Sequence, residues 1–382
     1  MDLQQRISEP SRSATGGSKD FFFSRKTMHM TKLRGPESPL YTAICPLVYN
    51  IRIFGLAPYE FHNDALVPST ASIFFCFFFC FSSCSSLHSP IQAAFNFFMA
   101  IFDILNTLFW RERFVRIWNV MQEYDEIVRN LGYARSERGT CVWAWFILIA
   151  NLLTWISVHK FGMAAFVEPW IQNVAYMIIY VGSSVSVIKF SGMALLLGQR
   201  FQHLNLVAKK NGPLASRWRM ASPVVDAKDI EYLHNVLLTA GESLNDIYSW
   251  SLLFWLANLS LHIVSDFYFV IQRFMKISWT WHEWKIISCL ISWIASFIGQ
   301  LVLLNYACDF AASEANCMGY IMINWRRWLK MRRRENVETS IHLINRRLNF
   351  SASGCFSVEL PLLRSIAALL TTYLVILIQF SE

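Results

Sequence analysis

Long apolar segments alternate with polar ones along most of the chain, and their lengths are those of membrane-spanning helices. About 20 mostly apolar residues cross the hydrocarbon core of a bilayer as an α-helix. The pattern therefore predicts an all-α membrane protein in which one transmembrane domain of seven helices occupies 70–382. The predicted spans lie at about 70–88, 91–110, 141–160, 166–190, 249–271, 285–307 and 360–380.

The residues before the first predicted span divide into two parts. Residues 1–38 are polar and basic and lack the apolar core of a signal peptide, so we expect a disordered cytosolic tail. Residues 39–69 contain an apolar stretch that is interrupted by Pro46, Arg52 and Pro58. Proline and a charge inside a span are unfavourable, so we interpret this part as a short or re-entrant helix with its connector.

Basic residues are concentrated in alternate connectors, which predicts the orientation of the chain. Cytosolic segments of membrane proteins carry an excess of Lys and Arg. With the N-terminus inside, the outer segments hold only Lys160, Arg273, Lys276 and Lys285. We therefore expect a cytosolic N-terminus and an extracellular C-terminus.

The predicted cytosolic connectors are long, and residues 229–248 place apolar side chains at helical spacing. Such helices would extend the spans into the cytosol and pack together there. The sequence thus predicts a cytosolic helical layer, which is a natural site for subunit assembly.

Composition agrees with a membrane protein and makes a nucleic-acid partner unnecessary. Hydrophobic residues make up 54% of the chain and charged residues 16%, whereas soluble domains carry about 25% charged residues. The net charge of +8 comes from basic connectors, including the run at 326–334, and contact with anionic lipid explains them.

Sequence patterns of known catalytic and metal sites are missing from the chain. It contains no phosphate-binding glycine loop, no HExxH and no CxxC pair. Cys76, Cys80 and Cys84 would share one helix face, but their Phe-rich setting without carboxylates favours small membrane residues over a metal site. We expect neither an enzyme nor a bound metal or cofactor.

Polar residues inside predicted spans are costly and often face a cavity or another helix. His262 and Asp266 lie four residues apart and so share a face of the fifth span. They would line a water-accessible pocket, form a mutual buried pair, or reach to the membrane interface. Tryptophans at the same depth fit either a small-molecule pocket or the interfacial aromatic belt. The candidate pocket residues are Trp170, Asn173, Tyr176, His262, Asp266, Trp284 and Ser288.

The seventh predicted span carries a stripe of small or polar residues at helical spacing, with bulky apolar residues beside it. A pore wall would have such a stripe, but composition alone favours ordinary packing between helices through small residues. The stripe consists of Ser365, Ala368, Thr372, Val375, Ile376 and Gln379.

The same span ends in the sequence TYLVILIQF, from Thr372 to Phe380. This segment resembles the TYhhhhhQF pattern, with h an apolar residue, at the C-terminal end of insect gustatory receptors. The preceding segment, IHLINRRLNFSASGCFSVELPLLRSIAALL, resembles the family's lead-in to its last span. FGLAPY at 54–59 and RFQHLN at 200–205 resemble two further motifs of the family.

Some positions depart from that family pattern. Cys355 follows Gly354 where bulkier residues are common, and Glu359 stands where Asp is frequent. Leu374 follows Tyr373, where the sugar-receptor branch often carries Glu. We therefore expect a receptor unlike that branch, while bitter-type receptors and the fructose-receptor branch remain open.

The resemblance implies a ligand-gated, non-selective cation channel in the plasma membrane of a sensory neuron, opened by a small-molecule tastant. It implies a homotetramer, or a heterotetramer with related receptors, assembled mainly through the cytosolic helical layer and surrounded by membrane lipids. Ligands would bind within each subunit, in the outer half of the bundle. The last span would line the pore, whose wall and gate would include Thr372, Val375, Ile376, Gln379 and Phe380.

Alternative functions for seven predicted helices are a G-protein-coupled receptor and a secondary transporter. The receptor would need the opposite orientation, and the chain lacks a DRY-like end to the third span and NPxxY in the seventh. An odd number of spans without a visible internal repeat argues against two inverted halves of a transporter.

Overall fold

The computed structural model describes residues 34–69, 90–166, 170–211, 225, 227–275, 280–328 and 345–379. The predicted first span at 70–88, with Cys76, Cys80 and Cys84, lies outside these residues. So do most of the predicted tail and Phe380.

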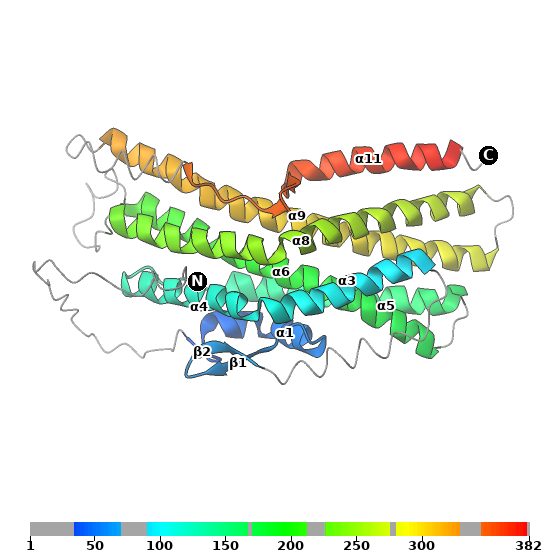
Figure 1. The fold of residues 1–382 in the computed structure, drawn as a ribbon, viewed down its shortest axis with the longest axis horizontal. Coiled ribbons are helices and arrows are strands. Elements are labelled where there is room, and N and C mark those ends of the chain that lie inside the picture. The colour runs from blue at the N-terminus through cyan, green and yellow to red at the C-terminus, as the bar shows by residue number, and fades with distance from the viewer. Residues whose placement is uncertain are drawn as a thin grey trace, which may run out of the picture. The chain divides into compact units, whose positions relative to one another are not determined.

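Long helices account for most of the described chain and run side by side (Figure 1). All but one of them overlap the predicted spans from the second to the seventh, in order. The exception, Arg111–Asn130, lies in the predicted connector after the second span. Five of the described helices are long and apolar enough to cross a membrane. The predicted all-α membrane architecture is thus confirmed, while its orientation stays a prediction. The long helices are α3 (Pro90–Phe109), α4 (Arg111–Asn130), α5 (Arg138–Phe166), α6 (Trp170–Asn211), α8 (Ala227–Phe274), α9 (Trp281–Trp328) and α11 (Leu360–Gln379).

Three of these helices extend well beyond the thickness of a membrane. Helix α6 has 42 residues, and helices α8 and α9 have 48 residues each. At a rise of 1.5 Å per residue these helices are about 63 to 72 Å long, against about 30 Å for a hydrocarbon core. The predicted connector helix at 229–248 and the span at 249–271 are therefore one continuous helix, α8. A helix of this length cannot lie wholly within a hydrocarbon core, so part of α8 must extend beyond it.

The interrupted apolar stretch before the first span forms a helix and a hairpin. Helix α1 (Pro39–Ile53) begins after Ser38, whose hydroxyl accepts a hydrogen bond from Tyr41 N at 3.2 Å. Strands β1 (Tyr59–His62) and β2 (Ala65–Pro68) follow as an antiparallel pair. The turn between them needs two residues with positive φ, which Asn63 and Asp64 supply. The pattern of apolar residues gave no sign of this hairpin.

Helix α6 is the central helix of the bundle and packs against α9, α8, α3 and α5. Its side chains Phe190, Leu197 and Phe201 are fully buried. Gly198 allows α9 to approach closely, because a Cβ atom at this position would lie 2.6 Å from Phe310 Cδ1. Close contact of α6 with α9 thus depends on one small residue.

The segment that leads into α11 is folded tightly onto α8 and α9. It includes two short paired strands, β3 (Ser351–Ala352) and β4 (Phe356–Ser357). Leu348, Phe350 and Val358 of this segment are buried in the main core. Helix α11 follows and has no buried residue. The lead-in is therefore firmly packed, while α11 contacts its own chain along one side only.

Candidate ligand site and pore helix

Aromatic rings from α5, α6, α8 and α9 pack into one cluster inside the bundle. The ring centroids of Tyr180 and Trp293 are 4.5 Å apart, and those of His262 and Phe297 are 4.7 Å apart. Trp155 joins them at 5.4 Å from Trp293. Edge-to-face and stacked pairs at these distances are favourable beyond the burial of their area. These five residues are called the aromatic cluster below.

Asn96 of α3 connects the polar atoms of the cluster. Its amide nitrogen donates to Tyr180 Oη at 2.9 Å, and its Oδ1 accepts from Asn258 Nδ2 at 3.0 Å. The same Oδ1 lies 3.1 Å from His262 Nε2. Because an amide oxygen only accepts, this contact requires the tautomer of His262 that carries its proton on Nε2. One asparagine thereby fixes the orientation of side chains from α6 and α8.

A cavity of about 630 Å³ lies between α5, α6 and α9 and adjoins the aromatic cluster. Its volume is in the range of small-molecule sites, which run from about 300 to 1,000 Å³. Most of its wall is apolar, with amide and hydroxyl groups from all three helices. The polar lining residues are Asn151, Thr154, Ser184, Gln199, Gln202, Ser296 and Gln300.

Asn151 joins this cavity to the cluster. Its Oδ1 accepts hydrogen bonds from Trp155 Nε1 at 3.0 Å and from Ser184 Oγ at 2.8 Å. Its Nδ2 atom is buried and has no hydrogen-bond partner among the described residues. A buried donor without a partner is unfavourable, and a small rotation of the side chain would turn it towards a ligand carbonyl or hydroxyl in the cavity. Asn151 is therefore a candidate for orienting a ligand.

The structure separates the pocket residues that the sequence predicted. His262 is 4% exposed and belongs to the aromatic cluster. It pairs with Asn96 instead of Asp266, whose buried Oδ2 has no hydrogen-bond partner within the described part of the chain. The alternative of a mutual pair is thus not what the structure shows.

The other predicted pocket residues are not among the five residues of the aromatic cluster. Trp170 is 62% exposed at the start of α6, and Trp284 is 48% exposed in the first turn of α9. The hydroxyl of Ser288 donates to the carbonyl of Trp284 at 2.8 Å, so its hydrogen bond stays within α9. Asn173 and Tyr176 lie in α6, but their side chains fall outside the described residues.

Sequence analysis missed most of the residues that the structure brings together. Asn96 and Asn151 are polar amides within predicted spans. Burying a polar side chain in a membrane is unfavourable, so their positions alone marked them as candidates. Trp155, Tyr180 and Trp293 gave none, because an aromatic residue in an apolar helix faces lipid as often as the interior. Only the packing of the helices distinguishes these cases.

The predicted stripe of the last span lies on the side of α11 that its own bundle leaves open. Apolar residues of α11, among them Leu362, Ile366 and Leu370, pack against the core. Every member of the stripe is exposed, from Ser365 to Gln379. The small and polar stripe therefore lies on the exposed side of α11, together with the bulky Leu369, Tyr373 and Leu377, and its role in a pore stays a prediction.

The side chains around the cavity suit the binding of an uncharged ligand. Amide and hydroxyl groups line its polar parts, and aromatic rings lie beside them. Within the described ranges, no group of three or more His, Cys, Asp or Glu side chains is placed to hold a metal ion. Such a cavity suits an uncharged molecule with an apolar face and a few hydrogen-bonding groups.

Comparison with known proteins places this arrangement in a family. A family described as 7tm Chemosensory receptor matches residues 89–382. The chain is similar to Putative gustatory receptor 2a of Drosophila melanogaster, with 28% identity over 159 residues, covering 36% of this chain and 37% of that protein. Gustatory and pheromone receptor 32a of Drosophila melanogaster is 27% identical over 160 residues, covering 41% and 34%. These alignments span only about a third of each curated relative.

Solved structures share the fold over nearly the whole chain. The insect olfactory receptor OR5 from Machilis hrabei aligns with a TM-score of 0.59 and 14% identity, covering 89% of this chain and 98% of that one. The same receptor in complex with eugenol aligns equally well. The family match extends over more than half of the sequence and includes the helices that form the cavity and the last span. The chain therefore belongs to the 7tm chemosensory receptor family, a multi-pass membrane family that includes the insect gustatory receptors it resembles.

Proposed function

We propose that this protein is a gustatory-type chemoreceptor, a non-selective cation channel that a small neutral tastant opens. The observation that carries the proposal is the cavity of about 630 Å³ between α5, α6 and α9, with the unpaired Nδ2 atom of Asn151 in its wall. Its rings and neutral polar groups would hold an uncharged organic molecule. Membership of a chemosensory family supports a sensory ligand over a metabolic substrate.

The exposed face of α11 supports a pore in an assembly of several subunits. A single chain leaves Thr372, Val375, Ile376 and Gln379 exposed. Four copies around an axis would bring these faces together, with Gln379 and Phe380 at the outer mouth. The helical layer formed by the extensions of α8 and α9 would hold the copies together on the cytosolic side.

Helix α9 would connect ligand binding to the pore. It contributes Ser296 and Gln300 to the cavity, and Asn316 further along the same helix holds the lead-in to α11. A ligand that binds the open state more tightly than the closed one would shift the equilibrium towards opening. A small displacement of α9 would thereby reach α11 through the lead-in.

Heterologous expression with calcium imaging tests this proposal, using a panel of sugars and bitter compounds. With an active compound in hand, Asn151→Leu should raise the half-maximal concentration about tenfold, the loss of one good hydrogen bond. Ser157→Leu, on the same helix but away from the cavity lining, is the matched control and should respond like the wild type.

Three results would contradict the proposal. If Asn151→Leu and Ser157→Leu had the same half-maximal ligand concentration, the ligand would bind at another site. An extracellular N-terminus, measured with a terminal tag on intact cells, would favour a G-protein-coupled receptor. Ligand-evoked unitary transport at the rate of a carrier would favour a transporter.

A further inference from the structure

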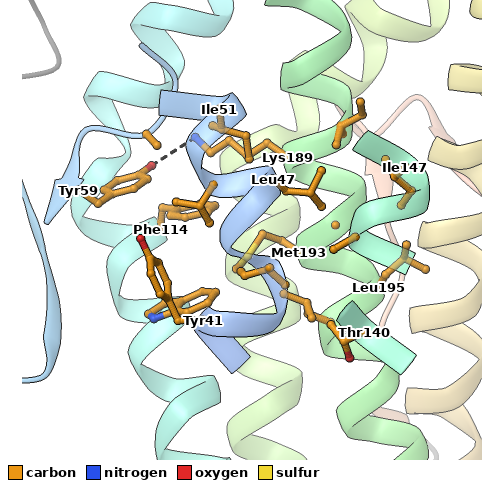
Figure 2. Close-up of a pocket in the computed structure, with 18 of the residues that line it drawn as sticks. Tyr41, Leu47, Ile51, Tyr59, Phe114, Thr140, Ile147, Lys189, Met193 and Leu195 are labelled. Atoms are coloured by element: carbon orange, nitrogen blue, oxygen red, sulfur yellow. Dashed lines mark hydrogen bonds between the residues drawn. The ribbon is translucent and has the colours of Figure 1, made fainter. Parts of the chain in front are cut away.

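A second cavity, of about 110 Å³, lies between α1, α4, α5 and α6, on the side of the α5–α6 pair away from α9. Figure 2 shows the side chains of Leu47, Ile51, Phe114 and Met193 directed towards the space between α1 and α6. Its wall is formed mainly by aliphatic side chains and aromatic rings. The larger cavity has no contact with α1 or α4, so the two spaces are separate.

Two charged residues, Lys189 and Arg52, line this cavity, and the protein supplies partners for both. Lys189 Nζ donates to Leu56 O at 2.8 Å and lies 3.3 Å from both Tyr59 Oη and Thr107 Oγ1. It also lies 4.6 Å from the ring centroid of Phe114. Burial raises the pKa of Tyr59 well above its usual value, so its hydroxyl stays neutral. The ammonium is committed to these partners. Arg52 also lines the cavity, and its Nη2 donates to Tyr59 O at 3.0 Å, so both charged side chains are held by the protein.

Gly192 of α6 leaves part of this space empty. It lines the cavity, and a Cβ atom built there would meet no atom within 4 Å. Glycine inside a helix is less favourable than alanine by about 1 kcal/mol. A larger residue would fit and would favour the helix, yet the position is occupied by the one residue that keeps the cavity open.

We propose that this cavity is a second ligand site, which takes an uncharged apolar group about the size of a benzene ring. An apolar cavity of about 150 Å³ in another protein stays dry and binds benzene or xenon, so this space has the size and chemistry for such a guest. Trp143 lines the cavity and is 60% exposed, which offers a route from the lipid. The guest would be a free apolar molecule dissolved in the bilayer or the hydrocarbon end of a lipid.

Both cavities share part of their walls, so a guest in one can affect the other. Ile147, Ile188 and Leu195 line the small cavity on one side and the large cavity on the other. Interiors are close-packed, so filling the small cavity would restrict movement of these side chains. The second site would thus modulate the first, although its existence does not depend on the function proposed above.

Thermal unfolding of the purified full-length protein, with benzene as the probe, tests the site. Saturating benzene should raise the apparent Tm of the wild type by about 1–3 °C, as expected for a weak ligand of the folded state. Gly192→Leu should fill the cavity and abolish this shift. Gly139→Leu, at an open and exposed position of α5 outside the cavity, should keep it.

A smaller substitution, Gly192→Ala, keeps the test informative if the Gly192→Leu protein does not fold. Gly192→Ala removes the volume of one methyl group and should still accept benzene but no longer p-xylene, which the wild type should accept. If a lipid already occupies the site, benzene will shift none of the proteins. Native mass spectrometry should then show a lipid retained by the wild type and Gly139→Leu but lost from Gly192→Leu.

These two arms distinguish a free apolar molecule from a lipid chain, and either result supports the site. The proposal is overturned if neither the benzene shift nor lipid retention depends on residue 192. It is overturned equally if Gly139→Leu loses binding to the same extent.

Discussion

Asn316 of α9 holds both backbone polar groups of Leu348. Its Oδ1 accepts from Leu348 N at 3.0 Å, and its Nδ2 donates to Leu348 O at 3.1 Å. The side-chain amide of Asn316 thus bonds to the N–H and the C=O of one residue, as the backbone of a neighbouring β-strand would. The contact joins the long helix of the candidate ligand site to the segment that leads into α11.

Asn316→Asp removes the donor for Leu348 O and places a carboxylate beside it. Leaving a buried carbonyl unpaired costs about 1–3 kcal/mol, so the lead-in should loosen. We expect a smaller ligand-evoked current per receptor at the cell surface, measured with surface biotinylation and whole-cell recording. Asn349→Asp is the control, because Asn349 lies on the same segment and donates to Ser357 Oγ in an exposed hydrogen bond. Equal currents for the two variants would disprove a role for the Asn316 contact.

Gly241 of α8 allows the side chain of Leu348 to pack closely against the helix. A Cβ atom at this position would lie 2.9 Å from Leu348 Cδ1, and Leu348 is only 1% exposed. Gly241→Val should therefore displace Leu348 at a cost of about 1–3 kcal/mol. The apparent Tm should fall by about 2–8 °C, whereas Gly139→Val, at an open position, should fall much less. A Tm unchanged at both positions would mean that the lead-in adjusts freely.

Asp125 and Arg200 form a buried ion pair between α4 and α6. Arg200 Nη2 lies 2.5 Å from Asp125 Oδ2, and the Arg200 side chain is fully buried. Asp125→Leu would leave that guanidinium unpaired, which costs about 3–5 kcal/mol, while Asp125→Leu with Arg200→Met should recover much of the loss. Thermal unfolding of the single and double variants measures the coupling. Additive losses would show that the pair contributes little.

His262 should influence ligand sensitivity through its hydrogen bond to Asn96. His262→Phe keeps a ring against Phe297 but removes the bond, which should move Tyr180 and raise the half-maximal ligand concentration about tenfold. The pore should still conduct. His282→Phe, at an exposed position in the first turn of α9, is the control. A dose response identical to that of the control would exclude the aromatic cluster from ligand recognition.

Gln379 and its neighbour Ile378 distinguish the two faces of α11. Gln379 is exposed, while Ile378 is half-buried. If the exposed face lines a pore, Gln379→Leu should change ion selectivity or gating and leave surface expression largely intact. Ile378→Leu should leave both unchanged. A loss of expression alone in Gln379→Leu would indicate a structural role and contradict the pore assignment.

The apolar pattern predicted the helical membrane fold because each span must satisfy its own backbone hydrogen bonds within one continuous segment. The same local rule could not reveal that α8 runs unbroken through a connector and a span. It also missed the hairpin after α1, whose turn depends on positive φ at Asn63 and Asp64. The exposed stripe of α11 was predictable, since helical spacing alone sorts its residues into faces.

The sequence by itself determined the helical membrane fold and the family, because these properties lie within single segments of the chain. Tertiary structure alone decided which intramembrane residues meet. Asn96 and His262 are separated by more than 160 positions, and Trp155 and Trp293 by more than 130, so no local pattern relates them. The physical reason is that a membrane helix is apolar on every side. Only the packing of its neighbours distinguishes a ring that faces lipid from one beside a cavity.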